Sequence, residues 1–245
     1  MDRLTLVIPC YDEEKRLNVE AFRGFEGEGV HFLFVDDGSR DGTRKLLQSL
    51  VASDPARFSL LALDRNRGKA EAVRQGIVKA FERKTDLVGF WDADLATPLG
   101  EIPSFLAIFD AAPQTQIVFA ARVRLLGRHI SRRPARHYVG RVGATLISAS
   151  LGLAIYDTQC GAKMFLVSDA TRSVFEKPFM SRWIFDVELV ARYVQLWGRD
   201  RVASSLYELP VMQWTDVSGS KVKGLDFLRA LRDLWRIHRA YNARS

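Results

Sequence analysis

The first half of the chain alternates short apolar runs with longer segments of mixed polarity. Between the runs, the spacing of apolar positions predicts helices over Glu13–Phe22, Thr43–Ala52, Gly68–Arg83 and Leu99–Ala111. The runs themselves have the length of buried strands: Leu4–Ile8, Val30–Val35, Phe58–Leu63, Leu87–Trp91 and Ile117–Ala121. Strands without polar alternation are buried on both faces. This succession therefore predicts an α/β fold with a mainly parallel central sheet and helices on both faces.

Polar and acidic residues follow each predicted strand. They include Pro9-Cys10-Tyr11-Asp12-Glu13-Glu14, Asp36-Asp37-Gly38-Ser39, Asn66-Arg67-Gly68-Lys69 and Asp92-Ala93-Asp94. The carboxyl ends of parallel strands meet at one edge of a sheet, and ligands bind there. Several carboxylates close together need a cation or hydrogen-bond donors to compensate their charge. A divalent metal ion at this edge meets that need.

The Asp92-Ala93-Asp94 element follows directly after one apolar run. Residues i and i+2 of a strand point the same way, so we expect both carboxylates to reach one ion. Mg²⁺ is held by one or two carboxylates together with substrate phosphate oxygens. The pattern therefore suits Mg²⁺ or Mn²⁺ on a departing nucleoside diphosphate, although a bare Asp-x-Asp is more often a solvated turn. In the neighbouring acidic loop we expect the Asp37 carboxylate to remain free to accept a hydrogen bond from a uracil or guanine edge.

Size and composition favour one folded domain in a reducing compartment. The chain has 245 residues, of which 47% are apolar, so a self-standing core is expected. Two cysteines provide no disulfide framework and no signal-peptide pattern opens the chain, which favours a cytosolic setting. The uncharged stretch Val142–Tyr156 is too short for a membrane span, which needs about 20 apolar residues. A buried or interfacial helix is the better interpretation.

The charge is unevenly distributed. The segment Arg122–Arg141 contains seven arginines and no acid, and Lys221–Ser245 has a net charge of +5. Together they hold +12 against +7 for the whole chain, so the remainder is net −5. An acidic body with two basic segments suggests a phosphate-bearing partner: an anionic membrane surface, a nucleic acid or a phosphorylated substrate. Solvated surface charge is the alternative interpretation, and composition alone does not exclude it.

Taken together, these motifs resemble those of inverting glycosyltransferases with the A-type nucleotide-sugar fold. Downstream motifs resemble the polyprenyl-phosphate branch, nearest to the dolichyl-phosphate glucosyltransferases: Asp157-Thr158-Gln159-Cys160-Gly161-Ala162-Lys163, Arg182-Trp183-x-Phe185-Asp186-Val187-Glu188 and Ser218-Gly219-Ser220-Lys221. The resemblance extends from Leu4 to about Lys223. It implies a transferase domain over residues 1–223, followed by a C-terminal helix over residues 224–245.

The resemblance also implies roles for single residues. Pro9, Tyr11 and Glu13 would line the nucleoside pocket, and Val35 and Asp37 would hold the base. Lys69 and Ala93 would also adjoin the donor. Asp92 and Asp94 would bind the metal ion, while Arg122, Arg182 and Lys221 would place positive charge against donor or acceptor phosphate. Mannose synthases, which are cousins of this branch, often carry glutamine where this chain has Ala96, and arginine where it has Thr215 or Asp216. Both departures favour glucose, and hence UDP-glucose as the donor.

The acceptor determines whether a general base is needed. A phosphate oxygen is already anionic near neutral pH, so the protein needs to supply only positioning and neutralisation of charge. The segment from Arg128 to Arg136 follows the fifth apolar run, and its Arg132 and Arg133 are candidates to hold the acceptor phosphate. If the acceptor were a soluble hydroxyl compound, a base would be required, and Asp186 or Glu188 would be the candidates.

The C-terminal segment has the pattern of a basic amphipathic helix. Arg229, Arg232, Arg236 and Arg239 share one stripe, and the opposite side carries Phe227, Leu228, Leu231, Leu234 and Trp235. Such a helix can lie on an anionic membrane, which would place the protein peripherally on the cytoplasmic face. It can equally dock on the body of the protein with its arginines in water. Nucleic-acid binding is a third hypothesis, disfavoured because Tyr138 is the only aromatic residue within Arg122–Arg141.

Overall fold

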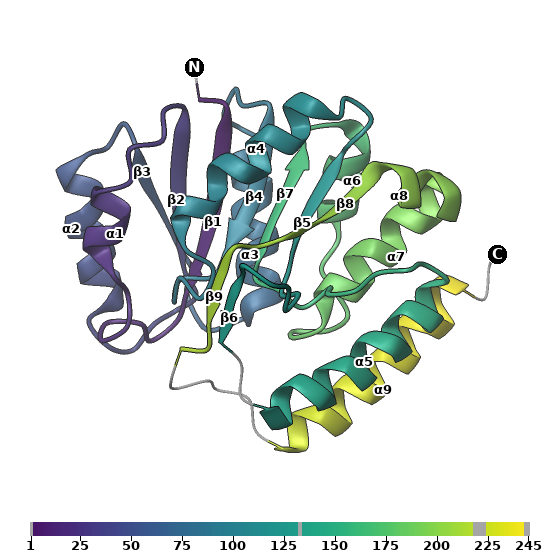
Figure 1. Cartoon of the computed structure of the whole chain (residues 1–245). Coiled ribbons are helices and arrows are strands. Elements are labelled where there is room, and N and C mark those ends of the chain that lie inside the picture. Colours follow the sequence, from purple (N-terminus) through teal and green to yellow (C-terminus); the bar gives the residue numbers. More distant parts are fainter. Residues whose placement is uncertain (1, 132–133, 218–223, 243–245) are drawn as a thin grey trace.

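The computed structural model describes residues 2–131, 134–217 and 224–242. A seven-stranded sheet forms its centre, with the strand order β3-β2-β1-β4-β7-β5-β8 (Figure 1). The strands are β1 (Leu4–Cys10), β2 (Val30–Asp36), β3 (Phe58–Ala62), β4 (Leu87–Trp91), β5 (Ile117–Ala121), β7 (Ala162–Leu166) and β8 (Leu206–Pro210). All five strands predicted from the apolar runs are present. Four of the five keep their expected first and last residues to within one position, and β1 continues two residues further.

Strand directions confirm the mainly parallel sheet, with one exception. β7 runs antiparallel to both of its neighbours, β4 and β5, and the other paired strands run parallel. β7 fills the gap between β4 and β5 after the chain has passed through a long excursion. The apolar runs of the first half did not reveal this strand. Its insertion brings the segment that precedes β7 next to the end of β4.

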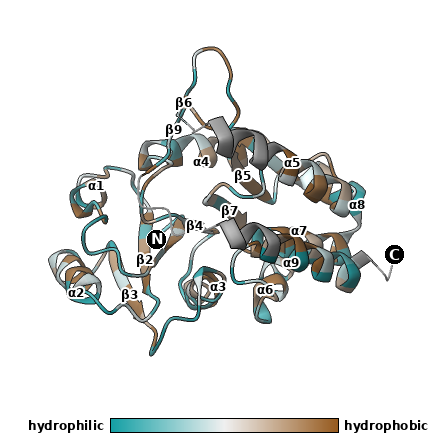
Figure 2. Ribbon diagram, turned by 90° about the horizontal axis from the view of Figure 1, so that it is seen from below, coloured by the Kyte–Doolittle hydropathy of each residue, from teal (hydrophilic) through white to brown (hydrophobic). Residues whose placement is uncertain are grey.

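Helices cover both faces of the sheet, as expected (Figure 2). Their bounds are α1 (Val19–Arg23), α2 (Thr43–Ser53), α3 (Lys69–Ala80), η1 (Leu99–Glu101), α4 (Ile102–Ala111), α6 (Asp169–Glu176), α7 (Phe185–Trp197) and α8 (Arg199–Ser205). The predicted helix over Glu13–Phe22 is wrong for its first half. The Asn18 side chain caps α1 by accepting from the Ala21 N–H, and the Glu13 N–H donates to Thr43 Oγ1 instead of starting a helix.

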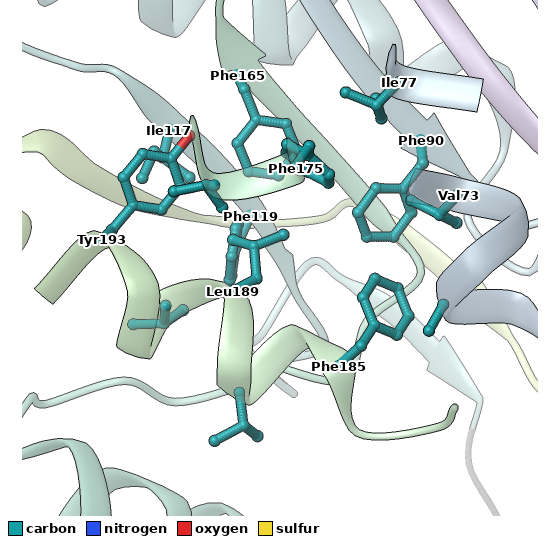
Figure 3. Packing of buried hydrophobic residues seen from close by; sticks show 14 of the residues in the cluster. Val73, Ile77, Phe90, Ile117, Phe119, Phe165, Phe175, Phe185, Leu189 and Tyr193 are labelled. Carbon is teal, nitrogen blue, oxygen red and sulfur yellow. The ribbon is translucent and has the colours of Figure 1, made fainter. Parts of the chain in front are cut away.

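Two hydrophobic layers sandwich the sheet, because successive strand residues point to opposite faces. On one face, strand side chains pack against α3, α6 and α7, and aromatic rings dominate this layer (Figure 3). The ring centroids of Phe90 and Phe185 lie 5.6 Å apart, which joins β4 to the first residue of α7. On the other face, Phe22 of α1 packs edge-on against Phe32 and Phe34 of β2. The two layers fix the strand ends that carry the polar loops.

The second half adds a helix pair and a small sheet. α5 (Pro134–Leu151) and α9 (Gly224–Asn242) lie side by side (Figure 1), and β6 (His129–Ser131) pairs with β9 (Gln213–Thr215). The described residues contain no helix that combines the length and the apolar character needed to span a bilayer. Within Val142–Tyr156, Ile147 and Leu151 are buried whereas Val142 and Leu146 are exposed, so this part of α5 is half core and half surface.

The C-terminal helix α9 docks on the body through part of its apolar side. Leu234, Ile237 and Tyr241 pack against the main core, and the Tyr241 hydroxyl donates to Glu188 on α7 at 2.9 Å. Leu231 and Trp235 point outward instead, with Trp235 59% exposed and the Arg239 guanidinium over its ring. The apolar side predicted for this helix is therefore divided between the core and the surface. Phe227 and Leu228, on the same side, lie in the part of the helix whose side chains are not described.

Candidate active site

Asp92 and Asp94 lie in a turn at the carboxyl end of β4. The strand ends at Trp91, and the Leu95 N–H donates to the Asp92 carbonyl at 3.1 Å, which closes the turn. Leu95 adopts a φ of 51°, a left-handed conformation that is rare outside glycine and concentrates at functional sites. The two carboxylates are thus brought together by a tight turn. The strand geometry expected from the sequence does not extend to these residues.

Two basic side chains compensate these carboxylates. Lys69, at the first position of α3, places its Nζ 2.5 Å from Asp92 Oδ1, and Arg16 places an Nη atom 3.4 Å from Asp94 Oδ2. Burial opposes the charged form of Lys69, but attraction by Asp92 and Asp186 outweighs it and raises the lysine pKa. Burial and the nearby Asp92 charge raise the pKa of Asp94. The two carboxylates thus carry close positive charge from the side chains of their own chain.

The adjoining loops after β1, β2 and β3 meet around Asp37. The Asp37 N–H donates to the Cys10 carbonyl at 2.8 Å, which joins the ends of β1 and β2. Its two carboxylate oxygens accept the N–H groups of Arg67 and Gly68 at 2.7 and 2.8 Å. The carboxylate is therefore already engaged by two backbone donors, which the sequence did not indicate, and the prediction that it accepts a hydrogen bond from a base stays a prediction. A carboxylate has about four acceptor positions, so room remains on Asp37 for one further donor. Burial raises its pKa.

Arg182 closes this group from the opposite side. Its Nη2 donates to Asn66 Oδ1 at 2.6 Å, and its Nε lies where a side chain at Gly68 would begin. Gly68 has a φ of 95° and stands immediately before α3, so glycine is required there both for conformation and for the approach of Arg182. The structure thus places Arg182 beside the loop that leads to Lys69.

Of the remaining residues predicted to contact the nucleotide, some lie at the strand ends around the site and one lies in the core. Pro9 and Tyr11 are half-buried at the end of β1, and Glu13 pairs with Arg16 at 3.3 Å. Ala93 is buried within the turn between the two aspartates. Val35 is different, because its side chain is fully buried in the core, close to Gly76 of α3. The prediction that the Val35 side chain contacts the base is therefore not met.

Arg122 forms a buried ion pair. Its Nε and Nη2 donate to the two carboxylate oxygens of Asp157 at 2.6 and 2.7 Å, and its backbone N–H adds a third bond to Asp157. The arginine charge and these hydrogen bonds outweigh the effect of burial and lower the pKa of Asp157. The guanidinium also lies over the ring of Trp214. Arg122 therefore faces a carboxylate of its own chain, where the sequence suggested a phosphate ligand.

The two candidate bases have different surroundings. Asp186 Oδ1 lies 2.8 Å from Nζ of Lys163, a fully buried lysine between the rings of Phe90 and Phe119, and burial raises the Asp186 pKa. Glu188 has no exposure. It accepts from Arg192 at 2.7 Å and from the Met180 N–H at 2.6 Å, in addition to Tyr241. Glu188 therefore joins α7 to α9 and does not face the site.

Comparison with known proteins adds the family. Residues 5–172 match the model of the family described as glycosyl transferase family 2. The chain belongs to this family. Among its relatives is a dolichyl-phosphate beta-glucosyltransferase of Mus musculus, 32% identical over 98% of this chain and 80% of the relative. Another is the Homo sapiens dolichyl-phosphate beta-glucosyltransferase, 30% identical over 96% of this chain and 78% of the relative.

Solved structures resemble this family 2 glycosyltransferase in fold. One is glucosyl-3-phosphoglycerate synthase from Mycobacterium tuberculosis with Mn²⁺, UDP and glucosyl-3-phosphoglycerate, at a TM-score of 0.66 and 17% identity, covering 98% of this chain and 80% of that one. Another is a mannosyltransferase from Pyrobaculum calidifontis with GDP-mannose and Mn²⁺, at a TM-score of 0.61 and 18% identity. This similarity covers 99% of this chain and 64% of the mannosyltransferase chain. These similarities confirm the nucleotide-sugar glycosyltransferase fold.

The residues present in the glycosyltransferase fit a divalent cation at Asp92 and Asp94. Both side chains are carboxylates, the donor type that Mg²⁺ and Mn²⁺ prefer, and basic side chains already lie against each of them. The described part of the chain contains no group of three or more acidic, histidine or cysteine ligands. Substrate oxygens and water would therefore have to complete the coordination of an ion held by these two residues.

Some predicted residues fall outside the description and others were missed. Arg132, Arg133 and Lys221 lie outside the described residues. Sequence reasoning missed Arg16, Asp157 and Lys163 as members of the charged network. Asp157 and Lys163 stand in a motif that carried the resemblance, and this was an available signal. No signal in the sequence indicated Arg16, because its contact with Asp94 joins segments 78 positions apart.

Proposed function

We propose that this glycosyltransferase transfers glucose from UDP-glucose, with inversion, to a polyprenyl phosphate such as dolichyl phosphate. The observation that carries the proposal is the 32% identity, over 98% of the chain, with a dolichyl-phosphate beta-glucosyltransferase. The paired carboxylates at the end of β4 support it, because transfer from a nucleoside diphosphate releases an anion that a held cation neutralises. In this proposal residues 1–223 carry the transferase site.

On the donor side, each loop is assigned one task. Pro9, Tyr11 and Asp37 contact the nucleoside, with Asp37 using its remaining acceptor positions. Asp92 and Asp94 hold Mg²⁺ or Mn²⁺, which stabilises the charge of the departing diphosphate when it is bound. Lys69 and Arg182 lie on either side of the loop before α3 and supply positive charge next to this position. These contacts keep the donor fixed while the anomeric carbon remains accessible.

On the acceptor side, charge and position suffice. A phosphate monoester oxygen attacks the anomeric carbon as the bond to the nucleotide breaks, so no proton needs to be removed. Arg132, Arg133 and Lys221 are the proposed ligands of the acceptor phosphate. We do not assign Arg122 as a direct ligand of the acceptor phosphate, because its guanidinium is paired with Asp157. Its proposed role is to support the site through this ion pair. A hydroxyl acceptor is disfavoured, because Glu188 is tied to Arg192 and Asp186 to Lys163.

The proposed lipid acceptor places the protein at a membrane surface. The outward side of α9 carries Leu231, Trp235 and several arginines, a combination suited to an anionic bilayer. Both cysteines are unpaired and buried, which agrees with a reducing compartment. We therefore propose a peripheral location on the cytoplasmic face of a membrane.

The test is glucosyl transfer by the purified protein. Radiolabelled UDP-glucose, GDP-mannose and UDP-N-acetylglucosamine would be offered in turn, with polyprenyl phosphate in detergent and Mn²⁺. We expect label in the lipid fraction with UDP-glucose alone, in a product with the inverted anomeric configuration. Asp94→Asn should lose at least about 100-fold in turnover. Asp110→Asn, which alters an exposed carboxylate on α4 paired with Arg3, should keep full activity.

Two further readings separate the parts of the proposal. The paramagnetic resonance signal of free Mn²⁺ measures how much of the ion is bound. Mn²⁺ binding should weaken in Asp94→Asn and remain unchanged in Asp110→Asn. Thermal unfolding should show that both variants are folded. Transfer from GDP-mannose in preference to UDP-glucose would overturn the donor assignment. Full activity of Asp94→Asn would overturn the metal assignment.

A further inference from the structure

The connection between β5 and β6 ends in a turn that displays apolar side chains to solvent. Arg128 N–H donates to the Leu125 carbonyl at 3.1 Å, so residues 125–128 form a closed β-turn. Gly127 is its third residue and has a φ of 80°, as a type II turn requires at that position. The turn holds Leu126 at its apex, where this side chain is fully exposed. In Figure 2 this connection projects beyond α4 and α5.

Neighbouring residues enlarge the apolar surface. Leu125 is 50% exposed and Met212, from the chain entering β9, is 46% exposed. Met212 lies against the turn, because its sulfur contacts the Arg128 guanidinium and its carbonyl accepts the His129 N–H. We call Leu125, Leu126 and Met212 the apolar tip. Single exposed leucines are ordinary, but adjacent large apolar side chains at a projecting apex indicate a surface that is covered in use.

A fixed base supports the apolar tip. Ile130 of β6 and Trp214 of β9 are buried beneath it, and Glu101 Oε1 accepts the N–H groups of Met212 and Gln213 at 2.8 and 2.9 Å. The Thr215 N–H donates to the Ala96 carbonyl at 3.0 Å, two residues beyond Asp94. The tip is thus tied through β9 to the loop that carries the proposed metal ligands.

Charge indicates what covers the tip. Arg124 and Arg128 flank the two leucines, and the sequence from Arg122 to Arg141 contains no acidic residue. Apolar side chains at the apex with arginines just behind them match the layers of an anionic membrane, where acyl chains lie beneath phosphate headgroups. A protein partner would need a much larger area than one turn provides.

We infer that the apolar tip inserts into the surface of a bilayer that contains anionic phospholipid, and that it presents the Asp92–Asp94 loop to the headgroup layer. This inference rests on the proposed function, because it gives the polyprenyl-phosphate acceptor a route to the site without leaving the membrane. The contact differs from the one proposed for α9, which lies on another part of the molecule. The turn that carries Leu125 and Leu126 leads into β6, which is followed in the chain by Arg132 and Arg133.

Site-specific labelling tests insertion directly. Cys10 and Cys160 are buried, so a cysteine introduced as Leu126→Cys can be labelled selectively with a polarity-sensitive fluorophore. Leu196→Cys is the matched control, because Leu196 is 48% exposed near the far end of α7. When vesicles of phosphatidylcholine and phosphatidylglycerol are added, the emission maximum of the label at position 126 should shift to shorter wavelength. Spin-labelled lipid should quench the fluorescence of this label. The label at 196 should show neither change. An unshifted label at 126, or equal shifts at both positions, would overturn the inference.

Vesicle sedimentation gives the second measurement. The double variant Leu125→Ser/Leu126→Ser should bind these vesicles at least about tenfold more weakly than the wild type, and Leu196→Ser should bind normally. Turnover of a short-chain polyprenyl phosphate in detergent should be unchanged in the double variant. If the wild type lacks this turnover, the proposed function fails while the vesicle result still decides the tip. A wild-type dimer in gel filtration that the double variant abolishes would assign the tip to a second copy and overturn the inference.

Discussion

Replacing Asp157 with alanine would leave the Arg122 guanidinium buried without its counter-charge. In the wild-type protein the pair has two charged hydrogen bonds of 2.6 and 2.7 Å, and the side chains are 14% and 8% exposed. Removing one partner of such a buried pair lowers the free energy of unfolding by about 3–5 kcal/mol. Asp157 also accepts the N–H groups of Arg122 and Gln159, which lose their partner in the same variant. We therefore expect a loss of about 4 kcal/mol.

Urea unfolding followed by tryptophan fluorescence would measure this loss, with the double variant Asp157→Ala/Arg122→Met as the control. Replacing both charges by apolar groups is often neutral, so the double variant should recover most of the stability. The two partners are in contact, so their effects should be strongly non-additive. A loss below about 1 kcal/mol in Asp157→Ala would refute the reasoning, because it would mean that Arg122 does not depend on this carboxylate.

The pair also predicts a pH dependence. The folded pKa of Asp157 lies below its unfolded value of about 3.9. A group of this kind contributes its stability above the unfolded pKa and loses it as the pH falls through the folded pKa. The wild type should therefore exceed Asp157→Ala in stability by a constant amount from pH 5 to pH 7, as rough limits, and by less as the medium becomes more acidic. An undiminished gap in strong acid would contradict the assignment.

Two further substitutions test the charged network around the site. Gly161→Ala would place a Cβ in direct conflict with the Asp92 carboxylate, so the carboxylate must turn away. The affinity for Mn²⁺ should then fall about tenfold or more, while the melting temperature changes little. Unchanged Mn²⁺ binding would separate Asp92 from the metal. Lys163→Met should lower the free energy of unfolding by about 3 kcal/mol at pH 8, because the buried Asp186 carboxylate loses its ion-pair partner. Burial raises the pKa of Asp186, so this loss should become smaller as the pH is lowered and Asp186 takes up a proton, and chemical unfolding over a series of pH values would show whether it does.

Local patterns in the sequence were sufficient for the central architecture. Uninterrupted apolar runs determine strands buried on both faces, and all five that were predicted are strands of the sheet. The order of strands and helices also determined where the acidic loops lie, because successive parallel strands end at the same edge. For this reason the Asp92-Ala93-Asp94 element and the loop that contains Lys69 were expected at the same edge of the sheet. The motifs that carry the family resemblance are local in the same sense.

Tertiary structure alone decided which charges face each other. The antiparallel insertion of β7 buries Lys163 against Asp186, and the docking of α9 on α7 occupies Glu188 with Tyr241. Neither contact leaves a periodic signal, because each joins segments that are distant along the chain. The same limit applies to Leu126, whose position at an exposed apex depends on how β6 and β9 pair. Sequence patterns report the environment of a residue averaged over its own element, whereas electrostatic partners depend on how the elements pack.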